Sequence, residues 1–155
     1  MSDHLAHSGV LIAIEGIDGA GKSTLQQHLA RRLRSKGWSV RMEREPHDPV
    51  LGAEALQHSR SDPWRAAAYF TYDRLAANGA LRRQLNERGI VLLDRSFFST
   101  LAYQGAHLTA TGVEWLEHLQ RAVTSAPERV LFLKLGAETA IARVRKRGRR
   151  ASPRE

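Results

Sequence analysis

The residues best suited to do chemistry lie near the start of the chain, in the segment AIEGIDGAGKST from Ala13 to Thr24. The segment fits the pattern G-x-x-x-x-G-K-S over Gly16–Ser23, in which glycines let backbone N–H groups converge on a phosphate. Lys22 can reach the β- and γ-phosphates of a nucleotide, and the Ser23 hydroxyl can bind Mg²⁺. The residues predicted to form this nucleoside triphosphate site are Gly16, Ile17, Asp18, Gly19, Ala20, Gly21, Lys22, Ser23 and Thr24.

A second acidic group for the same site follows the apolar run Ile90–Leu93, where Asp94 and Arg95 are adjacent. If the run is a strand of the same sheet, Asp94 emerges at the phosphate-binding end, where it could hold Mg²⁺ or its water shell. The alternative is that Asp94 caps the helix that follows. Arg95 lies at the same strand end and can bind a second phosphate group. Lys22, Asp94 and Arg95 are therefore candidate catalytic residues, and Ser23 and Asp94 are candidate metal ligands.

These side chains need a scaffold, and the remaining sequence alternates short apolar runs with helical patterns. The runs predicted as strands are Val10–Ile14, Ser39–Met42, Ile90–Leu93 and Arg129–Leu135. The patterns predicted as helices cover Leu25–Leu33, a stretch from Asp62-Pro63 toward Asn86, Val113–Val123 and Ala137–Arg147. The nearly unbroken apolar character of three of the strands is typical of strands covered on both faces. This order predicts an α/β fold, a parallel sheet flanked by helices, with ligand sites at the carboxyl ends of the strands.

Length and composition favour a single domain. The 155 residues are 42% hydrophobic and include no cysteine, so disulfides and cysteine-metal sites are excluded. No apolar stretch resembles a signal peptide or a membrane span. We therefore expect a cytoplasmic protein with a flexible leader at residues 1–9 and one domain over residues 10–155.

The net charge of +8 is concentrated at the end of the chain. The last 13 residues contain Arg143, Arg145, Lys146, Arg147, Arg149, Arg150 and Arg154. Such a cluster can bind nucleic acid or an acidic membrane nonspecifically, can be a solvated helix end, or can close over the phosphates of a small substrate. Because a phosphate loop lies elsewhere in the chain, we favour small phosphorylated substrates, with no specific nucleic acid and no membrane as partner.

Five motifs, taken in order, carry a family resemblance. They are Glu15–Thr24, Arg44-Glu45-Pro46, Phe70-x-x-Asp73-Arg74, Asp94-Arg95 and Ser99–Gly105. Together they resemble thymidylate kinase, a P-loop NTPase of the nucleoside monophosphate kinase type. The resemblance implies transfer of the γ-phosphoryl group of ATP to the 5′-phosphate of dTMP, giving dTDP, with ATP and Mg²⁺ as donor and cofactor. It also suggests a homodimer.

The resemblance assigns substrate-binding roles to individual residues. Phe70 and Arg74 are four residues apart, so on a helix they share a face, with one stacking on thymine and the other donating to its O4. Phe70 could equally be an ordinary core residue. Thr100 matches a position that contacts the base, Tyr103 one that stacks near the sugar, and Gln104 a further pocket contact.

The same resemblance implies which groups bind phosphates and the sugar hydroxyl. Asp18 resembles the residue that meets the 3′-OH of the acceptor, while Arg44 and Arg95 resemble residues that grip its phosphate. Gly19 and Ala20 offer no cation in the phosphate loop, so a loose phosphoryl-transfer transition state needs positive charge from elsewhere. The arginine-rich lid at about residues 143–155 is expected to supply it, with Arg147, Arg149 and Arg150 as candidate catalytic residues.

Two departures from the family pattern leave alternatives open. Ser96 stands where tyrosine commonly follows Asp-Arg, which leaves another P-loop nucleoside or nucleotide kinase as an alternative. Family members continue past the lid into further helices and a last strand, so we expect this chain to be C-terminally truncated relative to them. A nucleotide-binding module that does not catalyse is therefore a third possibility.

Overall fold

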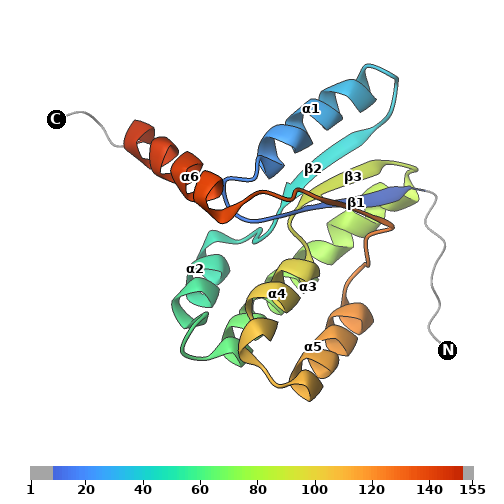
Figure 1. Ribbon diagram of the computed structural model, residues 1–155. Helices are drawn as coiled ribbons and strands as arrows, with labels where there is room; N and C mark the ends of the chain where they lie inside the picture. Colours follow the sequence, from blue (N-terminus) through green and yellow to red (C-terminus); the bar gives the residue numbers. More distant parts are fainter. Residues whose placement is uncertain (1–8, 152–155) are drawn as a thin grey trace.

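The computed structural model describes residues 9–151, of which residues 149–151 enter only as helical backbone. The order of elements is β1 (Val10–Glu15), α1 (Lys22–Arg34), β2 (Val40–Arg44), α2 (Pro49–His58), α3 (Pro63–Asn86), β3 (Ile90–Asp94), α4 (Phe97–Tyr103), a 3₁₀ turn η1 (Gly105–His107), α5 (Ala110–Val123), β4 (Arg129–Phe132) and α6 (Ala137–Ala151) (Figure 1). None of the described helices is long and apolar enough to cross a bilayer.

The four strands form one parallel sheet in the order β2-β3-β1-β4, which confirms the predicted fold class. The register pairs Asp94 of β3 with Ile14 of β1 on one side and with Arg44 of β2 on the other. Three strands therefore end together, and the phosphate loop, Arg44 and Asp94 meet at one edge of the sheet, as expected for a parallel α/β fold.

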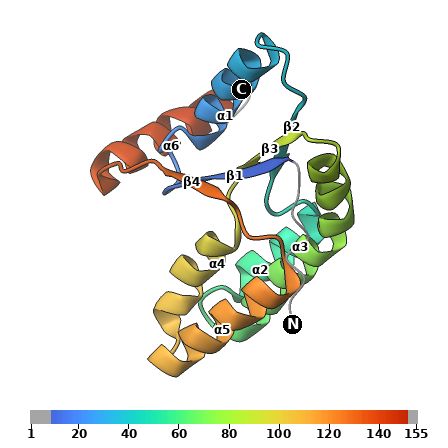
Figure 2. The ribbon, with the colours of Figure 1, turned by 90° about the vertical axis from the view of Figure 1, so that its right-hand side faces the viewer.

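Helices cover both faces of the sheet. Figure 2 shows α1 and α6 on one side and α2, α3, α4 and α5 on the other. Alternate residues of the strands enter two cores: Leu11, Val91 and Leu93 pack with Leu85 of α3, whereas Ile90, Leu92 and Val40 pack with Ala30 of α1. Each fully buried leucine contributes about 1.5–3 kcal/mol, so these contacts fix the sheet against its helices.

The helix boundaries follow local capping chemistry. The predicted start of α3 is confirmed, because Asp62 accepts a hydrogen bond from the backbone N–H of Arg65 and Pro63 is the first helical residue. The same signature, Asp48 followed by Pro49, starts α2, which the sequence analysis missed. The short helix α4 was also missed, and Ser96 caps it.

The edge strand β4 differs from the expectation that most strands are covered on both faces. β4 ends at Phe132, earlier than the predicted end at Leu135, and all of its residues are exposed. Among the described residues β4 pairs with β1 alone, so its outer edge has no neighbouring strand.

The predicted leader falls mainly on residues 1–8, which lie outside the described residues. Gly9, the last residue of the predicted leader, is buried, and a Cβ there would lie only 2.3 Å from the carbonyl oxygen of Gly89.

Candidate active site

The phosphate loop joins β1 to α1. Gly21 has φ 101°, a left-handed conformation that favours glycine, and caps α1 without a side-chain hydrogen bond. Lys22, the first residue of α1, is buried, and its Nζ donates to the carbonyl oxygens of Gly16 (2.9 Å) and Ile17 (3.0 Å). Burial and the nearby Arg95 guanidinium lower the pKa of Lys22, although Asp18 and other carboxylates act in the opposite direction. The ammonium group of Lys22 therefore lies inside the predicted phosphate-binding loop, next to Gly16 and Ile17.

Asp94 and Ser23 form a small oxygen site beside this loop. The Ser23 hydroxyl donates to Oδ2 of Asp94 at 2.6 Å. The other carboxylate oxygen, Oδ1, is buried and has no hydrogen-bond partner among the described residues. A hydroxyl and a carboxylate next to bound phosphates are ligands that suit Mg²⁺, which takes few protein ligands and keeps several waters. Ser96 caps α4, so the alternative that Asp94 is the helix cap is wrong.

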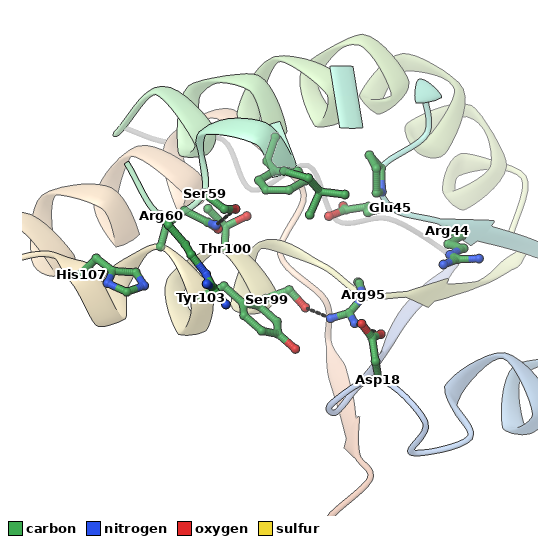
Figure 3. Close-up of a pocket in the computed structure, with 14 residues that line it drawn as sticks. Asp18, Arg44, Glu45, Ser59, Arg60, Arg95, Ser99, Thr100, Tyr103 and His107 are labelled. Atoms are coloured by element: carbon green, nitrogen blue, oxygen red, sulfur yellow. Dashed lines mark hydrogen bonds and ion pairs between the residues drawn. The ribbon is translucent and has the colours of Figure 1, made fainter. Parts of the chain in front are cut away.

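A cavity of about 470 Å³ opens next to the phosphate loop (Figure 3). Seven of the eight residues predicted to bind the acceptor line it, namely Asp18, Arg44, Phe70, Arg95, Thr100, Tyr103 and Gln104. They come from the phosphate loop, the ends of β2 and β3, α3 and α4, which the fold brings together. Phe70 lines the cavity and is half-buried, so it is not simply a residue of the core.

Asp18 and Arg95 link the phosphate loop to this cavity. Arg95 Nη2 donates to Asp18 Oδ1 at 2.5 Å, and Nη1 donates to Ser99 Oγ at 3.1 Å. The guanidinium also lies over the Tyr103 ring, 5.5 Å from its centre. Burial alone would raise the pKa of Asp18, but Arg95 and Lys22 outweigh it and lower that pKa. Arg95 has φ 75°, a strained backbone conformation typical of functional sites.

Arg74 is the one predicted acceptor residue that is not among those lining the cavity. It is buried and makes a bidentate ion pair with Glu45, with donor–acceptor distances of 2.8 and 2.5 Å. It also donates to Gln120 Oε1 (2.6 Å) and Thr100 Oγ1 (3.2 Å). Four of its five N–H groups thus have acceptors in these contacts, and one remains. Arg74 lies directly behind the cavity wall formed by Glu45 and Thr100.

Helix α6, which carries the predicted lid region, begins against the phosphate loop. A Cβ on Gly19 would lie 2.6 Å from the carbonyl oxygen of Ala140, so glycine allows α6 to approach closely. Arg143 Nη1 donates to the carbonyl oxygen of Gly19 at 3.3 Å. Arg147 is exposed further along α6, and the side chains of Arg149 and Arg150 lie outside the described residues. The basic helix therefore starts at the site, and the three predicted lid arginines follow within about two turns.

Comparison with known proteins agrees with this geometry. The family model for thymidylate kinase matches residues 14–155. A probable thymidylate kinase of Archaeoglobus fulgidus is 33% identical over 142 residues, which cover 90% of this chain and 71% of that protein. The thymidylate kinase of Xanthomonas euvesicatoria is 39% identical over 153 residues, covering 96% of this chain and 66% of that protein.

The chain belongs to the thymidylate kinase family. It spans about two thirds of the length of the Xanthomonas relative and somewhat more of the archaeal one.

The residue that departs from the thymidylate kinase pattern, Ser96, does not line the cavity described here. It is buried, and both its N–H and its hydroxyl donate to Glu15 Oε1, at 2.8 and 2.7 Å. Ser99 Oγ donates to the other oxygen of Glu15 at 2.8 Å. Ser96 therefore joins α4 to the end of β1.

The sequence analysis assigned no role to several polar residues that support the candidate site. Glu45 and Gln120 are buried partners of Arg74, and Asp73 is a buried partner of the loop after β2. The pattern Arg44-Glu45-Pro46 offered a weak signal, because it places a carboxylate next to a predicted phosphate-binding arginine. Gln120 lies 46 residues from Arg74, and no local pattern points to that contact.

Proposed function

We propose that this chain phosphorylates dTMP to dTDP, with ATP as the phosphoryl donor. The observation that carries the proposal is the ion pair between Asp18 and Arg95, which joins a phosphate loop to a cavity of nucleotide size. A donor in the loop and an acceptor in the cavity would meet at this pair, as in-line transfer between two bound nucleotides requires. Membership of the thymidylate kinase family supports thymidylate as the acceptor.

On the donor side, residues Gly16–Thr24 would bind the ATP phosphates through backbone N–H groups. Lys22 would turn from the carbonyls of Gly16 and Ile17 toward the β- and γ-phosphates, where its charge stabilises the migrating group. Ser23 and Asp94 would hold Mg²⁺, whose charge neutralises the phosphate oxygens when it is bound. The unpartnered Oδ1 of Asp94 supports this role.

On the acceptor side, Arg95 and Arg44 would bind the 5′-phosphate of dTMP, and Asp18 would accept from its 3′-OH. Phe70 would stack on the thymine ring, with Tyr103 next to the sugar. Thr100 and Gln104 would contact the edge of the base. Arg74 would reach the base only through its remaining N–H group.

Beyond the cavity, α6 would close over the phosphates during transfer, and Arg147, Arg149 and Arg150 would supply the positive charge that the loop lacks. The contact between Arg143 and Gly19 supports this closure, because it ties α6 to the loop that holds the donor. The homodimer and the cytoplasmic location remain predictions.

The direct test is incubation of the purified chain with ATP, Mg²⁺ and dTMP, followed by chromatographic separation of the nucleotides. We expect stoichiometric formation of dTDP and ADP, which stops when Mg²⁺ is chelated. ATP binding without dTDP formation would instead favour a nucleotide-binding module.

A further inference from the structure

The loop between β2 and α2, residues 45–48, forms one wall of the acceptor cavity. Glu45 and Pro46 line the cavity, and Arg44, which lines it as well, directly precedes the loop. Figure 3 shows Arg44 and Glu45 at the same end of the cavity as Arg95 and Asp18. The path of this loop therefore shapes the cavity wall next to Arg44, which is proposed to bind the acceptor phosphate.

Asp73 of α3 holds this loop from behind. Its side chain is almost fully buried, at 2% exposure, and is not among the residues that line the cavity. Oδ2 accepts the backbone N–H of His47 at 2.8 Å, and Oδ1 accepts the backbone N–H of Asp48 at 2.7 Å. The His47 ring lies nearby, with Nδ1 3.2 Å from Oδ2. Charge-assisted hydrogen bonds of this length are the strong ones, and both oxygens are used.

The neighbouring contacts leave the loop little freedom. Glu45 donates its N–H to the carbonyl oxygen of Asp94 at 3.1 Å, and its carboxylate pairs with Arg74. On the opposite side, α2 packs closely on Pro46, because a Cβ on Gly52 would lie 2.4 Å from the ring. Glu45 is thus held by β3 and α3, and Pro46 packs on α2 on one side, while the next two backbone N–H groups, those of His47 and Asp48, are held by Asp73.

One face of α3 therefore both lines and anchors the cavity. Phe70, Asp73 and Arg74 are three and four residues apart, so they project from the same side of the helix. Phe70 lines the cavity, whereas Asp73 and Arg74 hold the loop of residues 45–48. Nothing in the proposed chemistry uses Asp73, yet burying a carboxylate is costly unless it is fully hydrogen-bonded.

We infer that Asp73 is a positioning residue for the acceptor site, which acts on monophosphate binding through the loop of residues 45–48. It does so without touching the substrate. The inference rests on the proposed function, because it takes dTMP as the occupant of the cavity. Loss of Asp73 should release the backbone of His47 and Asp48, let the adjoining Pro46 shift in the cavity wall and so weaken dTMP binding, while the phosphate loop that would bind ATP keeps its geometry.

The test compares Asp73→Asn with wild type by calorimetric titration of dTMP and, separately, of ATP. Asparagine has the same shape but offers one acceptor oxygen in place of two, and its NH₂ group faces a backbone N–H. We expect the Kd for dTMP to rise about tenfold or more, because small misplacements of binding groups have effects of this size. The Kd for ATP and kcat at saturating dTMP should stay near the wild-type values, and Asp73→Ala should show a larger effect on dTMP.

Asp62→Asn is the matched control, because it makes the same substitution on the same helix at a cap that accepts from Arg65. We expect it to leave both dissociation constants unchanged. Equal loss of ATP and dTMP binding in Asp73→Asn would show that Asp73 only stabilises the fold, which overturns the inference. Unchanged dTMP binding in Asp73→Asn would overturn it as well, while leaving the proposed function intact. A wild type that does not bind dTMP would overturn both.

Discussion

The Lys22 ammonium group donates hydrogen bonds to two carbonyl oxygens of its own loop, those of Gly16 and Ile17. The proposed mechanism requires it to exchange them for phosphate oxygens. Lys22→Ala should therefore reduce phosphoryl transfer about a hundredfold to a thousandfold, since a charge that follows the migrating group is lost. The loop conformation depends on its glycines, so the variant should still fold.

Steady-state turnover and circular dichroism of Lys22→Ala check this expectation. Lys36→Ala, at an exposed lysine just after α1, is the control and should behave as wild type. Turnover close to the wild-type rate in a folded Lys22→Ala protein would contradict the assignment of this loop.

Asp18 gives a residue-scale prediction about pH. Arg95 and Lys22 overcome the effect of burial and lower its pKa below the usual 3.8. A carboxyl group whose pKa is lower in the folded state stabilises that state above the unfolded pKa, and the stabilisation disappears as pH falls through the folded pKa. The side chain is 72% exposed, so its pair with Arg95 contributes at most about 1 kcal/mol.

Thermal unfolding of Asp18→Asn and wild type at several pH values measures this contribution. The wild type should be slightly more stable at pH 7, and the difference should vanish well below pH 3.8. A difference that persists or grows in acid would mean that the ion pair with Arg95 is not its source.

At the scale of elements, two residues of α3 should behave differently although both are assigned to thymine. Phe70 lines the cavity, so Phe70→Ala should weaken dTMP by about 1–3 kcal/mol through lost stacking while stability changes little. Arg74→Ala should weaken dTMP and also lower the free energy of unfolding by about 3–5 kcal/mol, because Glu45 is left buried without its partner.

Calorimetry with dTMP and chemical denaturation of both variants separate these effects. ATP affinity of Phe70→Ala is the internal control and should not change. If both variants bind dTMP as tightly as wild type, the acceptor pocket lies elsewhere. If Arg74→Ala is as stable as wild type, the buried ion pair contributes little to folding.

The basic helix α6 carries the second prediction at this scale. Replacing Arg147, Arg149 and Arg150 together with alanine should lower turnover much more than it raises the Kd for dTMP. An arginine supplied to the transferring phosphoryl group can be worth roughly a thousandfold or more in rate. The control is a triple alanine variant of Arg31, Arg32 and Lys36, which are all exposed on or just after α1. It removes the same number of positive charges but leaves α6 unchanged.

Single-turnover rates with saturating ATP and dTMP check the role of α6. The control triple variant should turn over as wild type. Unchanged turnover in the α6 variant would mean that its arginines are a solvated helix end that only complements the helix dipole.

Sequence patterns predicted some elements better than others, for physical reasons. β1, β3 and α3 were predicted closely because their apolar periodicity or capping residues are local in sequence. α4 has only seven residues, too few to show a helical period. The end of β4 was misplaced because the apolar run continues to Leu135, whereas pairing with β1 ends at Phe132.

The same distinction applies to the site. The phosphate loop could be read directly, since its chemistry lies within ten consecutive residues. The pairing of Arg74 with Glu45 could not, because the two residues are 29 positions apart and meet only when α3 packs against the sheet. Asp73 was recognisable only as part of a motif, and its role depends on the three-dimensional path of the loop it holds.

At the scale of the whole molecule, the cavity next to the phosphate loop is proposed to accept thymidylate. The most direct measurement is an ATP-dependent phosphorylation panel with dTMP, dUMP, dCMP, dGMP and thymidine as acceptors. We predict the highest kcat/KM for dTMP, because Phe70 would stack on the base, Thr100 and Gln104 would contact its edge, and Arg95 and Arg44 would bind its 5′-phosphate. Preference for dGMP, or for thymidine without its phosphate, would contradict the claim.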